Sequence, residues 1–382
     1  MMNILVKLVA VCAVTVLSSC AGKSVSALHE SGDTIQLKYA QHITMVRHDG
    51  CTVVSLSNPW KRGAELHRYV LVARADSARM RNLPEGTVVY TPVRRSIVFT
   101  SPHCWLLGTL GAVDAIKGVC DLAYINLPGI QQLVHDGSVA DCGNSVQPSV
   151  ERIVSQRPQA IFVSPFDGVA YGQLDHIGVP LIECADYMET SALGRAEWMK
   201  FYGMLVGREA ESDSLFAEVE RNYDAWRTLA RRSQVRPRVI TERVVSGVWY
   251  CPGGRSSMGQ LIADAGGQYV FAGDSHSGSL TLAPEKVIAQ AADADRWLFV
   301  GSGDRLLAPA DLAAEYPGYR MIRAMREGQV YECLPSMTNP YFEEMSFRPD
   351  FLLMDFVKIF HPDLSFGEPP HYYSRIGGSG TR

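Results

Sequence analysis

The amino-acid sequence predicts an α/β protein in which two similar lobes are joined by one long helix. Short apolar runs alternate with helical patterns in two separate series along the 382-residue chain. Buried parallel strands joined by helices give rise to this alternation. Between the two series, residues 191–233 place apolar side chains at spacings of three and four without a proline. That pattern indicates an amphipathic helix that is long enough to connect two domains.

The chain begins with an export signal. Lys7 precedes an apolar run, residues 8–17, that is too short to span a bilayer. Two serines then precede Cys20, which resembles the lipobox of bacterial lipoproteins. We expect residues 1–19 to be a lipoprotein signal peptide and Cys20 to be lipidated, so that the protein is anchored to a membrane in the cell envelope, on the periplasmic side. A secretory leader with another cleavage site is the alternative.

A tether and a β-rich extension are predicted ahead of the first lobe. Residues 20–35 contain the lipidated cysteine and a mostly small, polar segment, as expected of a flexible tether. Residues 36–91 contain short apolar runs separated by Gly, Asn and Pro, which predicts antiparallel strands. These strands are expected at Ile43–Val46, Thr52–Leu56, Tyr69–Ala73 and Val88–Tyr90.

The two α/β lobes are predicted for residues 92–190 and 234–365, followed by a tail of residues 366–382. Apolar runs bounded by turn residues predict their strands: Ser96–Thr100, Ala160–Ser164, Pro180–Cys184, Arg238–Glu242 and Trp297–Gly301. Helical patterns cover Trp105–Leu110, Met258–Ala265 and Phe351–Phe360.

Composition excludes several functions. The net charge of −4 and the lack of a dense Lys/Arg cluster beyond positions 231–236 argue against nucleic acid as a partner. Seven cysteines follow Cys20 without any C-x-x-C spacing, so we predict no metal cluster and no resident cofactor. They fit best as small buried side chains, although an oxidising compartment permits one or two disulfides. These cysteines are Cys51, Cys104, Cys120, Cys142, Cys184, Cys251 and Cys333.

Several motifs together resemble the substrate-binding proteins of iron-chelate and cobalamin ABC importers. They are Arg95–His103 running into Leu110–Asp121, Ser149–Val154 with Arg157–Val163, Leu261–Gly267, Ala283–Ile288 and Arg348–Pro362. The resemblance covers about residues 92–365. It implies two Rossmann-like lobes joined by a single long interdomain helix, no catalytic residues, and an ABC permease with its ATPase in the inner membrane as partners.

Two glutamates at predicted helix starts are candidates for permease docking. A carboxylate in the first turn of a helix also complements the helix dipole, which contributes about 0.3–1 kcal/mol. Glu151 and Glu285 recur in similar contexts in the two halves of the chain. The resemblance implies that each contacts the permease from one lobe. Charge pairs of this kind set orientation and encounter rate more than affinity.

The resemblance places a small metal chelate in the cleft between the lobes, where loops leave the carboxyl ends of the strands. Aromatic walls suit a large flat ligand such as a corrin, a porphyrin or a catecholate chelate. Siderophore, haem and cobalamin all stay open, although small polar residues precede both glutamates where cobalamin-binding members are expected to have aromatic contacts. The wall residues expected are His103, Trp105, Tyr124, Ser145, Phe166, Trp249, Tyr250, Arg255 and Ser279.

Three other functions compete with this one. Residues 273–280 superficially resemble the nucleophile block of GDSL-type esterases, but the block comes late and its Asp-x-x-His partner motif is missing. A zinc- or manganese-binding importer component also has two lobes, yet only His103 and His276 fall in the cleft loops. An adhesion lipoprotein without a small ligand is the third. We therefore predict a lipid-anchored substrate-binding protein and no enzyme.

Overall fold

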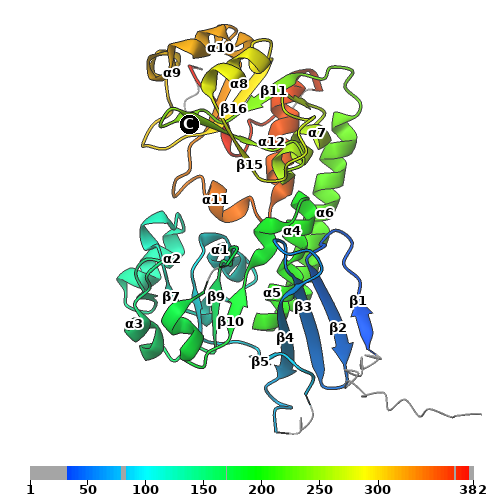
Figure 1. Cartoon of the computed structure of the whole chain (residues 1–382), viewed down its shortest axis with the longest axis vertical. Coiled ribbons are helices and arrows are strands. Elements are labelled where there is room, and N and C mark those ends of the chain that lie inside the picture. Colours follow the sequence, from blue (N-terminus) through cyan, green and yellow to red (C-terminus); the bar gives the residue numbers. More distant parts are fainter. Residues whose placement is uncertain (1–31, 79–82, 169, 365–366, 378–382) are drawn as a thin grey trace, which may run out of the picture.

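Two α/β lobes lie at opposite ends of the molecule in the computed structural model, and a β-sheet extension packs beside the first lobe (Figure 1). The structure describes residues 32–78, 83–168, 170–364 and 367–377. The predicted signal peptide and Cys20 lie outside these ranges. No helix in the described ranges is long and apolar enough to cross a membrane.

The extension is a five-stranded sheet in the order β1-β2-β3-β4-β5. Neighbouring strands are antiparallel except β4 and β5, which are parallel. The prediction of antiparallel strands is therefore wrong for the last pair, whose strands are separated by more residues than a hairpin turn contains. Alternate side chains such as Met45, Leu56 and Tyr69 enter the core. The strands are β1 (Asp33–Ile35), β2 (Ile43–His48), β3 (Cys51–Ser57), β4 (Glu65–Ala73) and β5 (Thr87–Thr91).

The first lobe is built on a parallel sheet in the order β10-β9-β6-β7-β8. Its strands β6 and β9 are almost wholly apolar because they are buried on both faces, as the sequence predicts. The strands are β6 (Ser96–Val98), β7 (Ile116–Val119), β8 (Ala140–Asp141), β9 (Ala160–Val163) and β10 (Leu181–Glu183). The helices are α1 (Ser101–Thr109), α2 (Pro128–His135) and α3 (Val150–Ser155).

The second lobe repeats this plan with the sheet order β14-β11-β16-β17-β18, and a small antiparallel sheet, β12-β13-β15, lies beside it. Only β18, from the predicted tail, runs antiparallel in the main sheet. The strands are β11 (Arg238–Thr241), β12 (Val244–Val245), β13 (Val248–Pro252), β14 (Gln268–Tyr269), β15 (Ser279–Leu282), β16 (Arg296–Val300), β17 (Val330–Cys333) and β18 (Tyr373–Arg375). The helices are α7 (Ser257–Asp264), α8 (Pro284–Ala291), α9 (Pro309–Glu315), α10 (Arg323–Arg326), α11 (Tyr341–Glu344) and α12 (Pro349–Phe360).

The linking helix is shorter than predicted, because residues 192–230 form three helices. These are α4 (Ala192–Glu197), α5 (Met199–Val206) and α6 (Glu209–Ala230). Gly207 ends α5 with a left-handed conformation, φ 68°, which glycine adopts without strain. Gly203 lets α5 and α6 cross closely, since a Cβ there would lie 2.2 Å from the Ser212 hydroxyl. The 22 residues of α6, about 33 Å of helix, connect the lobes (Figure 1).

Two buried carboxylates hold the extension against the linking helices. Glu197 accepts hydrogen bonds from the backbone N–H groups of residues 38, 39 and 40 at 2.7–3.0 Å. Glu189 accepts from those of residues 41 and 42 at 2.9–3.0 Å, and from the Trp198 indole at 2.9 Å. Hydrogen bonds to a buried charge are among the stronger ones in proteins, so the extension is fixed to the first lobe.

Candidate functional site

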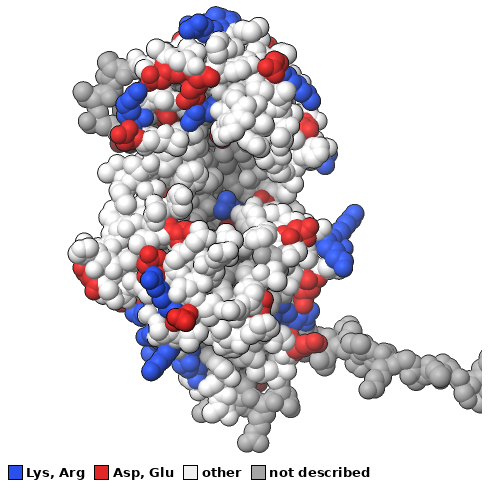
Figure 2. Space-filling model, turned by 60° about the vertical axis from the view of Figure 1, so that its left-hand side comes forward, with Lys and Arg blue, Asp and Glu red and all other residues white. Residues whose placement is uncertain are grey.

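A cavity of about 520 Å³ opens at the carboxyl ends of β6, β7 and β9 in the first lobe. Its polar lining includes Thr100 after β6, Asp121 after β7 and Ser164 after β9. The loops after parallel strands converge at one edge of the sheet, which is where ligands bind in open α/β folds. The molecular surface is also hollowed between the two lobes (Figure 2).

Apolar side chains line much of this cavity and are open to solvent. Val146 is 81% exposed and Phe166 is 58% exposed, and both line the cavity. Large apolar groups kept at the surface of a cavity are typical of a ligand site, because contact with the ligand removes them from water. Among the described lining residues, Asp121 is the one that carries a charge.

Asp121 joins the loops that follow β7 and β8. Its backbone is left-handed, φ 53°, and its N–H donates to the Gly143 carbonyl at 2.8 Å. Its carboxylate accepts from the Ser145 N–H at 3.2 Å. These bonds hold the predicted wall residue Ser145 at the rim of the cavity.

Behind Thr100 lies a buried polar network that contains His103. Nε2 of His103 lies 3.0 Å from the Asp186 carboxylate, which also accepts from Arg195 Nε at 3.1 Å and from the Tyr202 hydroxyl at 2.8 Å. Nδ1 of His103 contacts the Thr100 hydroxyl. The prediction that His103 lines the cleft is therefore wrong, because its ring is 4% exposed and both of its nitrogens are engaged inside the protein.

The network determines how Thr100 presents itself to the cavity. Burial alone raises the pKa of Asp186, but His103, Arg195 and Tyr202 together lower it to about 2, so the carboxylate is ionised at neutral pH. The Thr100 hydroxyl contacts Nδ1 of His103, so the network holds this hydroxyl in place at the edge of the cavity.

The other predicted residues of the first lobe lie on or near the surface. Ser145 and Phe166 line the cavity. Tyr124, in the turn that follows β7, is 77% exposed, and Trp105 on α1 is partly buried against the core. Sequence reasoning missed Thr100 and Asp121. Thr100 is the last residue of the predicted strand Ser96–Thr100, and Asp121 ends the motif Leu110–Asp121. Both stand at strand ends, a position that faces the ligand in parallel sheets.

In the second lobe, three of the four predicted residues are exposed. Tyr250 on β13 is 46% exposed, and β15 begins at Ser279, which pairs with the last residue of β13. The N–H of Arg255 donates to the His276 carbonyl at 3.0 Å, while its side chain is exposed. The prediction for Trp249 is wrong. It is fully buried, its indole donates to the Thr241 carbonyl at 3.0 Å, and its ring packs against Trp297.

The two candidate docking glutamates are exposed in the first turns of helices in different lobes. Glu151 lies on α3 and Glu285 on α8. Glu285 accepts a hydrogen bond from the Tyr316 hydroxyl at 3.0 Å. Glu151 is the one acidic residue in the first turn of α3, which is a short helix.

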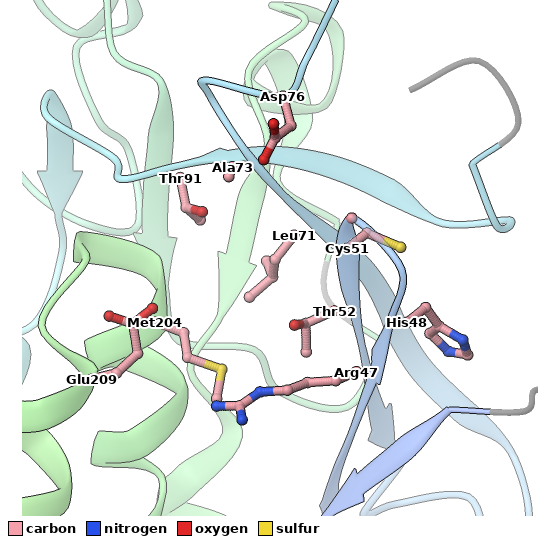
Figure 3. A pocket seen from close by; sticks show the side chains of 11 residues that line it. Arg47, His48, Cys51, Thr52, Leu71, Ala73, Asp76, Thr91, Met204 and Glu209 are labelled. Atoms are coloured by element: carbon pink, nitrogen blue, oxygen red, sulfur yellow. The ribbon is translucent and has the colours of Figure 1, made fainter. Parts of the chain in front are cut away.

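A second cavity, of about 330 Å³, lies away from these strand ends, between the extension and the linking helices. Figure 3 shows Arg47 extending from β2 toward Met204, with Glu209 beside it at the start of α6. Its lining carries both signs of charge, so it favours neither an anion nor a cation. Within the described ranges, no three His, Cys, Asp or Glu side chains are grouped so that they could hold a metal ion.

Comparison with known proteins decides the family. Residues 98–336, more than half of the chain, match the periplasmic binding protein family. The chain belongs to this family. The resemblance seen in the sequence and the predicted two-lobe α/β fold are thereby confirmed.

Periplasmic binding proteins also supply its structural neighbours. A periplasmic haem-binding protein, RhuT, from Roseiflexus sp. RS-1 has a TM-score of 0.56 and 22% identity, covering 72% of this chain and 100% of that one. A Fe³⁺-hydroxamate transport protein from Saccharomonospora viridis has a TM-score of 0.54 and 19% identity, covering 70% and 93%. At these identities the likeness shows the fold.

Two sequence relatives span most of the chain. Both are described as uncharacterized lipoproteins of Methanocaldococcus jannaschii. One is 23% identical over 368 residues, covering 90% of this chain and 86% of the relative. The other is 25% identical over 325 residues, covering 81% and 80%. This periplasmic binding protein is therefore an envelope-associated component of ABC-type transport, and its family works with a permease and an ATPase.

Proposed function

We propose that this periplasmic binding protein captures an iron chelate, a siderophore or haem, between its lobes and delivers it to an ABC permease while a lipid on Cys20 anchors it to the membrane. The observation that carries the proposal is the cavity at the strand ends, with Val146 and Phe166 exposed on its wall. Structural neighbours described as a haem-binding protein and as a Fe³⁺-hydroxamate transport protein support this class of cargo. Cobalamin is the alternative.

The charge of the cavity lining limits further which chelates we expect to bind. The first lobe offers the carboxylate of Asp121 and the hydroxyl of Thr100 to the ligand, and its other described lining residues are uncharged. A strongly anionic ferric catecholate is repelled by this surface, whereas a neutral ferric hydroxamate with an apolar periphery is not. Haem fits if its propionates face Arg255 of the second lobe, since guanidinium pairs well with carboxylates.

The proposal is tested by titrating the mature protein with ferric hydroxamates, ferric catecholates, haem and cyanocobalamin. Binding is measured by tryptophan quenching and visible absorbance. We expect one uncharged or weakly charged chelate to bind tightly. Phe166→Ala should weaken that binding about tenfold, because a ring contact contributes about 1 kcal/mol or more. Tyr90→Ala is the control, since Tyr90 is a similarly exposed aromatic residue on the extension. Equal losses in both variants, or no binding across the panel, would refute the proposed site.

Docking on the permease is the second part of the proposal. We expect the double substitution Glu151→Ala and Glu285→Ala to abolish uptake of the cargo and to leave its affinity for the purified protein unchanged. The control is the double substitution Glu211→Ala with Glu327→Ala. It removes two other exposed glutamates, one on α6 and one directly after α10. Normal uptake by the variant that lacks Glu151 and Glu285 would show that these glutamates are not part of the docking surface.

A further inference from the structure

Two cysteines of the first lobe follow the ends of neighbouring strands. β7 and β8 are parallel, with Gly118 opposite Ala140 and Val119 opposite Asp141. The residue after the last pair is a cysteine on each side, Cys120 after β7 and Cys142 after β8. The N–H of Cys142 donates to the Val119 carbonyl at 2.8 Å. This bond belongs to the Val119–Asp141 pair and holds Cys142 beside the end of β7.

Their side chains point to the same side of the sheet. Both are buried in the same apolar cluster, which also contains Ile97, Ile153 and Ile161. A Cβ added to Gly118 would lie 2.8 Å from the sulfur of Cys142. The sulfur therefore leans over Gly118 on β7, two residues before Cys120, and the missing side chain of Gly118 leaves room for it.

Neighbouring strands lie about 4.8 Å apart, and disulfides join Cα atoms that are about 4.4–6.8 Å apart. Electrostatics supports the proximity. Burial raises the pKa of Cys120 most, and the neighbouring Cys142 raises it further. Cys104, Cys184 and Cys251 come from other elements, α1, the end of β10 and β13.

We propose that Cys120 and Cys142 are joined by a disulfide in the exported protein. The envelope is an oxidising compartment, where such bonds form and persist. The thiolate of one cysteine attacks the disulfide of a disulfide-bearing oxidant, and the second thiolate then displaces the mixed disulfide. One S–S bond forms, the two thiols lose two protons and two electrons, and the oxidant leaves as a dithiol. Because both thiols are 0% exposed in the folded chain, the exchange takes place during folding.

The bond would hold the wall of the cavity. Asp121 follows Cys120, and Gly143 follows Cys142. These two residues already share a hydrogen bond from the Asp121 N–H to the Gly143 carbonyl, and Ser145 bonds to the Asp121 carboxylate. A covalent link one residue before each loop limits how far the loops separate. This consequence follows from the loop geometry and does not depend on which cargo binds.

The test uses the full chain exported to the periplasm of a Gram-negative host. The protein is denatured in an alkylating agent without a reductant, digested and examined by mass spectrometry. We expect one peptide pair linked through Cys120 and Cys142, while Cys104, Cys184 and Cys251 carry the alkyl group. Alkylation of both Cys120 and Cys142 would overturn the proposal.

Two variants sharpen the result. In Cys120→Ser, the Cys142 thiol should become fully alkylated, and a Cys142 that stays protected would show a different partner and overturn the assignment. In the double variant Cys120→Ser with Cys142→Ser, we expect faster amide hydrogen exchange at Asp121 and Ser145 than in the exported parent, with unchanged exchange in α7. Unchanged exchange at Asp121 and Ser145 would overturn the role of the bond in holding the cavity wall.

Discussion

Glu197 provides the sharpest test of how the extension is attached. Its carboxylate is 1% exposed and accepts three backbone hydrogen bonds from residues 38–40, one on Oε1 and two on Oε2. Lys200 Nζ lies 3.7 Å away and supplies the nearest countercharge. We predict that Glu197→Gln loosens the extension while the two lobes keep their fold.

The magnitude follows from the number and type of these bonds. A hydrogen bond to a charged group contributes about 1.5–3 kcal/mol, and one to a neutral group about 0.5–1.5 kcal/mol. The amide of glutamine has one acceptor oxygen, so at least one of the three N–H donors then faces an NH₂ group. One bond is lost and the charge is removed from the rest, which together costs about 3 kcal/mol. That difference corresponds to about a hundredfold change in a local opening equilibrium.

Hydrogen exchange followed by mass spectrometry measures this opening directly. At the amides of residues 38–40, we expect protection to fall about a hundredfold in Glu197→Gln. Protection in the β11 and β16 peptides of the second lobe should not change. Glu211→Gln is the matched control, because Glu211 is exposed on α6 and pairs with Arg208 at 3.1 Å, an interaction that contributes little. Full protection of residues 38–40 in the Glu197 variant would show that the carboxylate does not hold the extension.

Two further predictions concern the pH dependence of stability. Burial raises the pKa of Glu242 from 4.5 to about 7, so the unfolded chain loses this proton first and stability falls by about 3 kcal/mol as the pH rises from 4.5 through 7. Urea unfolding of Glu242→Gln should lack this loss, and parallel curves for the two proteins would refute it. The lowered pKa of Asp186, about 2 against 3.8, contributes about 2 kcal/mol that is present above pH 4 and lost as the pH falls through 2. Asp186→Asn should lose that amount at pH 7 and unfold less steeply in acid, and an unchanged acid transition would contradict the ionised network.

Much of the fold was predictable because buried parallel strands consist of continuous runs of apolar residues. β6, β9, β10 and β11 were all expected within two residues of their ends for this reason. Gly203 and Gly207 could be expected to bend the linking helix, but its break into separate helices was not predictable. A glycine inside a helical pattern is tolerated. Gly203 is needed for the close crossing of α5 and α6, and Gly207 for its left-handed backbone at the end of α5, and both features arise only in the folded protein.

The exposure of the site residues was predictable only where their position along a strand determined it. Tyr250 faces outward and Trp249 inward because neighbouring residues on β13 face opposite sides, and the sequence does not say which side is the core. His103 follows a strand end as expected, but its partner Asp186 is 83 residues away. Glu197 looked like an ordinary charge on a helix, and its backbone partners lie more than 150 residues earlier.

Contacts between the lobes bear on how cargo is released in the proposed transport cycle. Besides α6, the lobes meet where α11 lies on α1, and the buried carboxylate of Glu343 accepts a hydrogen bond from the Asn126 N–H at 2.8 Å. The ring of Phe347 also packs against His103, with centroids 5.6 Å apart. Wide opening must break these buried contacts, and leaving the Glu343 carboxylate without its donor costs several kcal/mol. Spontaneous opening is therefore rare. The proposed docking at Glu151 and Glu285, one on each lobe, can supply this energy because the permease then binds the open arrangement more tightly than the closed one.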